Sequence, residues 1–217
     1  MSGRKRVVVF ISGSGSNMEK LAEACEAPGF PAEIVAVISD KLDAAGLPKA
    51  KARGIATYAL ARKDYDSKQA HEAAMLGLLA DLAPDFICLA GFMRLLSGDF
   101  IRAYEGRIIN IHPSLLPLFP GLDTHQRALD AGMRIAGCSV HFVTEGMDEG
   151  PIIGQAAVPI MPGDTTDALA KRILTVEHRL YPAALRRLAE GEVRMENGRA
   201  VFTNRGIDGA EQILIAG

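Results

Sequence analysis

Short apolar runs rich in β-branched residues alternate with helix-prone segments through the first half of the chain. These runs lie at Val7–Ile11, Glu33–Ser39, Ile55–Leu60 and Asp85–Ala90. The first reads VVVFI, and a continuous apolar run is typical of a strand that is buried on both faces of a parallel sheet. Strands that alternate with helices pair in parallel through right-handed crossovers. The pattern therefore predicts an α/β fold with a central, mostly parallel twisted sheet and helices on both faces.

The second half of the chain is predicted to contain further strands, a proline-rich loop and two helices. Strands are expected at Arg107–His112, Gly137–Val143 and Ile152–Ile160. Its two helices are expected at about 124–131 and 166–190, after the three expected in the first half at about 18–27, 44–53 and 66–82. Pro182 predicts a kink in the helix at 166–190. An Asn197-Gly198 pair between alternating apolar residues predicts a terminal hairpin.

The composition argues against several classes of function. Hydrophobic residues make up 48% and charged residues 23% of the 217 residues, and the formal net charge is −2. A charge so close to neutral gives no support for binding to nucleic acid or to an anionic membrane. The N-terminal apolar run is too short for a signal peptide or a membrane span. We expect a cytoplasmic protein with small-molecule substrates, either a monomer or a homodimer.

Cysteine and histidine spacing gives no metal site. Cys25, Cys88 and Cys138 are far apart, and the last two lie in apolar stretches typical of a core. No cluster of His, Cys and carboxylate residues has the spacing of metal ligands, so we expect no metal. Three histidines are interpreted as structural: His71 on a helix surface, His125 near a helix start and His141 in a buried strand.

The first chemical signal is SGSGSN, Ser12–Asn17, between the first strand and the first helix. Glycines allow a tight turn, and the free N–H groups of the helix start attract an anion such as a phosphate. The loop also follows the carboxyl end of a strand, where open α/β sheets bind ligands. It matches neither the dinucleotide-binding nor the Walker pattern. The alternative is an ordinary turn in which Ser16 or Asn17 caps the helix.

The second signal is NIHPSLLP at Asn110–Pro117. In a strand, Asn110 and His112 project to the same side while Ile111 packs into the core. Pro113 ends the strand and favours an extended His112. An amide donor beside an imidazole can stabilise a carbonyl oxygen as it becomes an oxyanion. The alternative is a capped strand end with a hydrogen-bonded histidine.

The third signal is the acidic, glycine-bounded loop Thr144–Pro151, which contains Asp148. Taken alone, it is best interpreted as a solvated turn between two strands. A carboxylate there gains a function only where the fold brings it to His112, whose charged form it would favour and whose ring it would orient.

Together, these segments resemble the phosphoribosylglycinamide formyltransferase family of folate-dependent formyltransferases. The similar segments are ISGSGSN, LAGFMRLLS at Leu89–Ser97, NIHPSLLP, SVHFVTEGMDEGPII at Ser139–Ile153 and EHRLYP at Glu177–Pro182. The resemblance extends from about Val7 to Leu188, and the segment after about Asn204 matches nothing in the family. It implies a Rossmann-like formyltransferase fold in a single domain, 1–217. The half at about 1–104 would bind phosphate, and the half at about 105–217 would carry catalysis and folate binding.

The resemblance also implies an activity and its residues. The formyl group of the co-substrate 10-formyltetrahydrofolate would pass directly to the amine of glycinamide ribonucleotide, a step of purine biosynthesis. The family's catalytic residues match Asn110, His112 and Asp148. Its ribonucleotide contacts match Gly15, Ser16, Asn17, Leu174, Thr175, Val176 and Glu177. Its folate contacts match Lys68, Met93, Arg94, Leu95, Leu96 and Asn110. Lys68 stands where an arginine is expected, so it keeps the charge but loses the two-pronged donor.

Three other functions remain open. A methionyl-tRNA formyltransferase would need a further basic domain, and a formyltetrahydrofolate deformylase normally carries an N-terminal regulatory domain. A non-catalytic folate-binding or nucleotide-binding protein is the alternative from another class. It would not need Asn110, His112 and Asp148 together.

Overall fold

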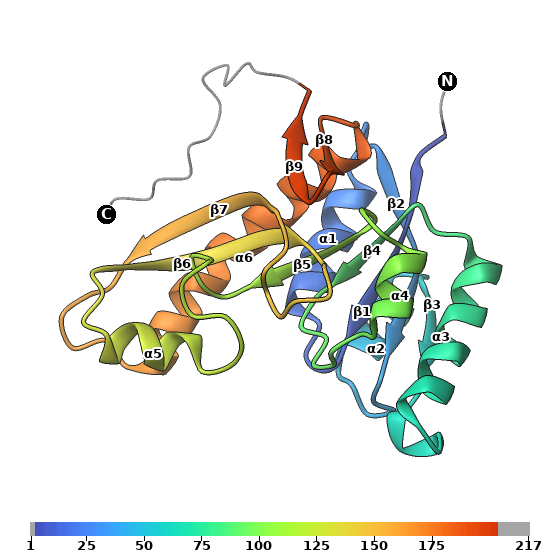
Figure 1. Cartoon of the computed structure of the whole chain (residues 1–217), viewed down its shortest axis with the longest axis horizontal. Coiled ribbons are helices and arrows are strands. Elements are labelled where there is room, and N and C mark those ends of the chain that lie inside the picture. Colours follow the sequence, from blue (N-terminus) through green and yellow to red (C-terminus); the bar gives the residue numbers. More distant parts are fainter. Residues whose placement is uncertain (1–2, 204–217) are drawn as a thin grey trace. The chain divides into compact units, whose positions relative to one another are not determined.

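The structure is a computed structural model, and it describes residues 3–203 (Figure 1). The segment after Asn204, which matches nothing in the family, lies outside the described residues. The chain forms two compact units, Met1–Asn110 and Ile111–Gly217. Seven strands form one sheet in the order β3-β2-β1-β4-β5-β6-β7, and a separate hairpin pairs β8 with β9.

The first unit contains the parallel part of the sheet. Its strands are β1 (Lys5–Ile11), β2 (Ala32–Ser39), β3 (Ala56–Ala59), β4 (Phe86–Leu89) and β5 (Ile108–His112), the last of which ends in the second unit. β1 pairs in parallel with β2 and β4, β2 with β3, and β4 with β5. Val7–Ile11 is fully buried, as its uninterrupted apolar sequence predicts. The predicted α/β class and the mostly parallel sheet are confirmed.

The helices of the first unit connect these parallel strands. They are α1 (Ser16–Glu26), α2 (Gly46–Ala52), α3 (Lys68–Leu82) and α4 (Gly98–Ala103), with the short 3₁₀ helix η1 (Arg62–Asp64) before α3. Ser67 caps α3 by accepting a hydrogen bond from the Ala70 N–H at 3.0 Å. At α1 the alternative of a cap at Ser16 or Asn17 is wrong, because the cap position is Gly15 in a left-handed conformation.

The second unit adds the antiparallel strands. β6 (Ile135–Phe142) and β7 (Ile152–Pro159) pair antiparallel, because the connection at 143–151 is too short for a parallel crossover of about a dozen residues. The helices are α5 (Thr124–Asp130) and α6 (Thr166–Ala189), and α6 runs on through Pro182. The kink at Pro182 stays a prediction. The terminal hairpin is confirmed as β8 (Val193–Glu196) and β9 (Arg199–Phe202), with left-handed Asn197 and Gly198 in its turn.

Two local features differ from the sequence analysis. The helix α4 was not predicted, because six residues are too few to establish a periodicity, although Ser97 caps it at the Phe100 N–H. His71 was expected on a helix surface but is only 2% exposed, since its ring packs against Tyr65 and contacts the Leu60 carbonyl at 2.7 Å. Within residues 3–203, no helix is long and apolar enough to cross a membrane.

Candidate functional site

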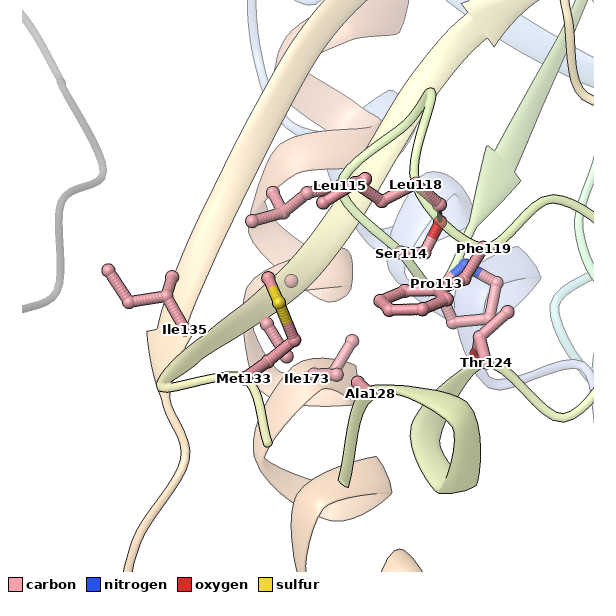
Figure 2. A pocket seen from close by; sticks show the side chains of 12 residues that line it. Pro113, Ser114, Leu115, Leu118, Phe119, Thr124, Ala128, Met133, Ile135 and Ile173 are labelled. Carbon is pink, nitrogen blue, oxygen red and sulfur yellow. Dashed lines mark hydrogen bonds between the residues drawn. The ribbon is translucent and has the colours of Figure 1, made fainter. Parts of the chain in front are cut away.

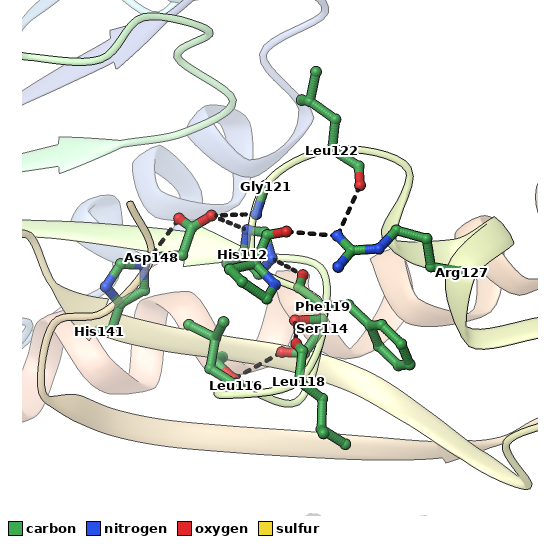
Figure 3. Close-up of polar contacts among 12 residues, drawn as sticks. His112, Ser114, Leu116, Leu118, Phe119, Gly121, Leu122, Arg127, His141 and Asp148 are labelled. Carbon is green, nitrogen blue, oxygen red and sulfur yellow. Dashed lines mark hydrogen bonds and ion pairs between the residues drawn. The ribbon is translucent and has the colours of Figure 1, made fainter. Parts of the chain in front are cut away.

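His112 is the last residue of β5 and is 5% exposed. Its Nδ1 lies 3.3 Å from Oδ2 of Asp148, and its Nε2 lies 2.9 Å from the Phe119 carbonyl oxygen (Figure 3). A carbonyl can only accept, so Nε2 carries a hydrogen and donates it. Both ring nitrogens thus face acceptors.

Asp148 comes from the loop between β6 and β7, which the sequence alone left as a solvated turn. The structure instead brings its carboxylate beside His112, with the side chain 14% exposed. The Gly121 N–H donates to the same oxygen, Oδ2, at 2.8 Å. Asp148 has a left-handed backbone with φ of 56°, a conformation that few residues other than glycine, asparagine and aspartate adopt readily. The position of the carboxylate is therefore fixed by its own backbone and by two donors.

A second histidine lies on the other side of Asp148. His141 of β6 is buried, and its Nε2 is 3.7 Å from Asp148 Oδ1, beyond hydrogen-bond distance. Its Nδ1 donates to the Phe142 carbonyl at 2.9 Å. Burial lowers the pKa of His141, against the opposing effects of that carbonyl and of Asp148. The expected core histidine is thus confirmed, but no pattern in the sequence indicated its proximity to Asp148.

The loop after His112 is held from below by β6 and β7. Ser139 is fully buried; its Oγ donates to the Ser114 carbonyl at 2.7 Å and accepts from the Leu116 N–H at 3.0 Å. Gln155 Nε2 donates at 2.9 Å both to that Oγ and to the Leu116 carbonyl. Three hydrogen bonds use the full capacity of the serine hydroxyl, so the loop is anchored at one buried point.

Apolar side chains fill the space beneath the same loop (Figure 2). Leu115 and Phe119 face Met133 and Ile173 around a cavity of about 10 Å³. Such a cavity holds one water at most. It is therefore a packed floor for the loop and not a substrate pocket.

The SGSGSN segment forms the turn from β1 into α1. Gly15 is left-handed with φ of 72°, and the Gly46 N–H donates to the Gly13 carbonyl at 3.0 Å. Ser16 and Asn17 are the first two residues of the 11-residue helix α1, and Asn17 is buried. Backbone N–H groups at a helix start are suited to an anion, and phosphate binding by this turn stays a prediction.

A polar network joins the strand ends of the first unit to the segment at Met93–Leu96. Ser12 Oγ donates to Asp40 Oδ1 at 2.5 Å and accepts from the Met93 N–H at 2.8 Å. Asp40 is buried, and Arg94 Nε donates to its Oδ2 at 2.8 Å. Arg94 is therefore paired with Asp40 through Nε, while Met93 and Leu95 are 63% and 62% exposed.

The remaining sequence-derived candidates differ in how accessible they are. Lys68 is at the start of α3, with Nζ 3.7 Å from Glu72 Oε1. In α6, Leu174 is half-buried, Thr175 is exposed, and Val176 and Glu177 are buried. The side chain of Val176 is fully buried and that of Glu177 nearly so, and a ligand contact at either residue stays a prediction. Among residues 3–203, no three His, Cys, Asp or Glu side chains are grouped so that they could hold a metal ion.

An open α/β sheet that carries a histidine–carboxylate pair at one strand end and a glycine-lined helix start at another belongs to the class of ligand-binding α/β proteins with strand-end sites. Residues 5–185 match the model of the formyl transferase family, and the chain belongs to that family. The resemblance that the motifs indicated is thus confirmed.

Three relatives match most of the chain. The chain is 44% identical to phosphoribosylglycinamide formyltransferase of Escherichia coli K12 over 89% of its own length and 92% of that protein. A crystal structure of the enzyme of that name from Brucella melitensis is 69% identical, with a TM-score of 0.83 over 86% of this chain and 96% of that one. Glycinamide ribonucleotide transformylase 1 of Symbiobacterium toebii is 45% identical, with a TM-score of 0.91 over 94% and 96%.

Two other relatives are longer than this chain. The trifunctional purine biosynthetic protein adenosine-3 of Bos taurus is 47% identical over 90% of this chain, which spans only 20% of that protein. A formyltetrahydrofolate deformylase from Pseudomonas syringae is 26% identical, with a TM-score of 0.86 over 94% of this chain but 67% of that one.

Proposed function

We propose that the chain is a phosphoribosylglycinamide formyltransferase. It transfers the formyl group of 10-formyltetrahydrofolate to the amine of glycinamide ribonucleotide in purine biosynthesis, and releases the N-formyl product and tetrahydrofolate. The observation that carries the proposal is the His112–Asp148 pair at 3.3 Å, in a chain with family relatives of this name over nearly its full length. A non-catalytic binding protein has no need of such a pair.

In the proposed mechanism, the substrate amine attacks the formyl carbon while the electrons of the C=O bond move to the oxygen. Asn110 and the cationic His112 stabilise that oxygen, and Asp148 balances the charge of the imidazolium. The amine then loses a proton, and a proton reaches the folate nitrogen as the C–N bond breaks, through His112 or water. No covalent enzyme intermediate is required.

The resting contacts of His112 bear on this mechanism. Both ring nitrogens already face acceptors, Asp148 and the Phe119 carbonyl. For the ring to donate to the formyl oxygen, it must exchange one of them. We assign the exchange to the neutral Phe119 carbonyl, because the carboxylate interacts more strongly with a cationic ring.

Ribonucleotide binding is proposed for two segments. The N–H groups at Gly15, Ser16 and Asn17 would hold the phosphate. The chain has a net charge of −2, so a general excess of positive charge is not what would attract the phosphate. The α6 segment at 174–177 would contribute further contacts, from Thr175 and Glu177 and from the half-buried Leu174. Val176 would support them from the core.

Folate binding is proposed for the segment Met93–Leu96, with Lys68 and Asn110. Exposed Met93 and Leu95 offer apolar surface for a flat pterin ring. Arg94, which is bound to buried Asp40, would hold the segment in place more than it contacts the ligand. Lys68 supplies one positive charge for a folate carboxylate.

Several broader properties belong to the same proposal. We propose that the whole chain acts as one catalytic domain in the cytoplasm, as a monomer or homodimer, without metal and without nucleic-acid or membrane partners. The phosphate-binding half would comprise about 1–104 and the catalytic half about 105–217, although the proposed folate contacts at Met93–Leu96 lie in the first of these.

The test is an absorbance assay for the folate product with glycinamide ribonucleotide as the acceptor. We expect turnover that depends on both substrates. Release of formate without an acceptor would indicate a deformylase instead. Binding of both ligands without turnover would indicate a non-catalytic protein. Either result would overturn the proposal.

A further inference from the structure

We propose that Arg127 is a positioning residue of the His112–Asp148 pair and acts through the peptide bond between Pro120 and Gly121. The inference rests on the proposed function, because it concerns the geometry of the proposed catalytic pair. Arg127 lies in α5, and neither the motifs nor the family resemblance pointed to it.

The contacts form a continuous chain (Figure 3). Arg127 Nη1 donates to the Pro120 carbonyl at 2.5 Å and to the Leu122 carbonyl at 3.2 Å. The Pro120 carbonyl and the Gly121 N–H belong to one planar peptide unit. That N–H donates to Asp148 Oδ2 at 2.8 Å, the oxygen that faces His112 Nδ1. A cation thus holds one end of the peptide, and the catalytic carboxylate receives the other.

The peptide needs to be held because its surroundings are strained. Gly121 has φ of 81°, and the non-glycine residues Phe119 and Asp123 have φ of 54° and 57°. Left-handed conformations of such residues cost about 1–3 kcal/mol each and persist only when other contacts enforce them. A half-turn of the peptide would direct the Pro120 carbonyl, instead of the Gly121 N–H, at the Asp148 carboxylate. Arg127 opposes that rotation by binding the carbonyl.

Two further effects act in the same direction. The positively charged Arg127 guanidinium, bound to the Pro120 carbonyl, polarises the peptide and strengthens the hydrogen bond that the Gly121 N–H donates. The Arg127 guanidinium also lies 5.3 Å from the centre of the Phe119 ring, at cation–π distance. The carbonyl of Phe119 accepts from His112 Nε2. Arg127 therefore restrains the acceptor on one side of His112 and the donor to Asp148 on the other.

The experiment combines kinetics with NMR on the full chain. Arg127→Met keeps an unbranched side chain but removes the charge and the donors. Arg127→Lys restores the charge, and Arg127→Gln is a milder change in case Arg127→Met fails to fold. Arg134→Met is the matched control, because Arg134 is exposed and, among residues 3–203, only its backbone carbonyl makes a hydrogen bond. The readouts are kcat, both KM values and the chemical shift of the Gly121 amide proton.

We expect Arg127→Met to lower kcat by about 10- to 100-fold, the range for a misplaced catalytic group, with both KM values within about threefold. The Gly121 amide proton should move upfield in Arg127→Met and also in Asp148→Asn, and Arg127→Lys should recover part of both effects of Arg127→Met. Arg134→Met should match the parent in every readout.

The proposal is overturned if kcat is unchanged in folded Arg127→Met, or if kcat falls while the Gly121 amide signal stays in place. A fall in kcat that Arg134→Met reproduces has the same consequence. Failure of the proposed function is distinguishable, because the parent would then show no formyl transfer at all. The amide signal would still report whether Arg127 controls the peptide.

Discussion

The backbones of Gly15 and Gly46 are in direct contact. A Cβ atom on Gly15 would lie 2.8 Å from the Cα of Gly46, and one on Gly46 would lie 3.0 Å from the Cα of Gly15 and 2.5 Å from Ile11 Cδ1. The start of α2 is thus packed against the turn that leads into α1, and only two glycines permit that approach.

Gly46→Ala should therefore disturb the proposed phosphate loop. We expect a loss of about 1–3 kcal/mol in the free energy of unfolding, as for other overpacked sites, and a higher KM for the ribonucleotide with little change in the KM for folate. Urea unfolding and steady-state kinetics measure the two effects.

Gly77→Ala in α3 is the control: outside the backbone of its own helix, a Cβ atom there would meet no atom of residues 3–203 within 4 Å. It should stabilise the protein by about 0.5–1 kcal/mol. Equal KM effects for both substrates would contradict the phosphate-loop assignment.

Removal of either member of the catalytic pair should abolish most of the turnover. His112→Ala and Asp148→Asn should each lower kcat by about 10²- to 10⁴-fold. Asparagine tolerates the left-handed backbone at position 148, so Asp148→Asn should keep its fold. Circular dichroism and thermal melting check the fold, and the folate absorbance assay checks turnover. Near-normal turnover in either variant would remove that residue from the mechanism.

Ser139→Ala should destabilise the loop that follows His112. The change leaves the buried Leu116 N–H without the acceptor it has now, at a cost of about 1–3 kcal/mol. Gln155→Ala should cost less, because it leaves both backbone bonds of Ser139 intact. Urea unfolding of the two variants side by side tests this order, and a larger effect for Gln155→Ala would show that Ser139 is not the main anchor.

The Asp164–Arg172 ion pair should contribute stability that depends on pH. The two-pronged Arg172 guanidinium, helped by the Met161 N–H, lowers the pKa of Asp164 to about 2. Since the pKa is depressed in the folded state, the contribution is complete above the unfolded value of about 4 and is lost as the pH falls through the folded value. The difference in urea midpoint between the parent and Asp164→Asn should therefore shrink between pH 4 and pH 2. A difference that is constant over this range would contradict the pairing.

All three thiols should be inert in the folded protein. Cys25, Cys88 and Cys138 are buried, and burial raises the pKa of Cys25 to about 12. The thiolate is the reactive form, so a thiol reagent at pH 8 should label none of them until the chain unfolds. Labelling in urea should then recover three thiols per chain. Rapid labelling under native conditions would show that the core around one of them opens locally.

The sequence was sufficient to predict most of the fold, because the parallel strands are short, continuous apolar runs bounded by turns. Val7–Ile11 is the clearest case, since burial on both faces leaves no polar residue in it. The helix α4 was missed because six residues do not complete two turns. The left-handed cap at Gly15 was missed because the neighbouring serine and asparagine are themselves common caps.

The site was predictable in part. Alternation along a strand identified Asn110 and His112, but no local pattern places Asp148 beside His112, because its position depends on how β6 and β7 pair. The resemblance supplied that residue, and the structure supplies the geometry. Arg127 had no signal at all in the sequence: an arginine on a short helix is usually a solvated residue, and its contacts are with backbone carbonyls, which every sequence has.

A residue at position 148 must meet two independent requirements: it must adopt a left-handed backbone, and it must carry a carboxylate at the place of the Asp148 side chain. Glutamate would keep the carboxylate but fits the backbone poorly, and its longer side chain would displace the charge. Asparagine and glycine fit the backbone but lack the charge. A screen for growth that depends on this enzyme should therefore recover aspartate almost alone at position 148, whereas a screen for folded protein should also recover asparagine and glycine.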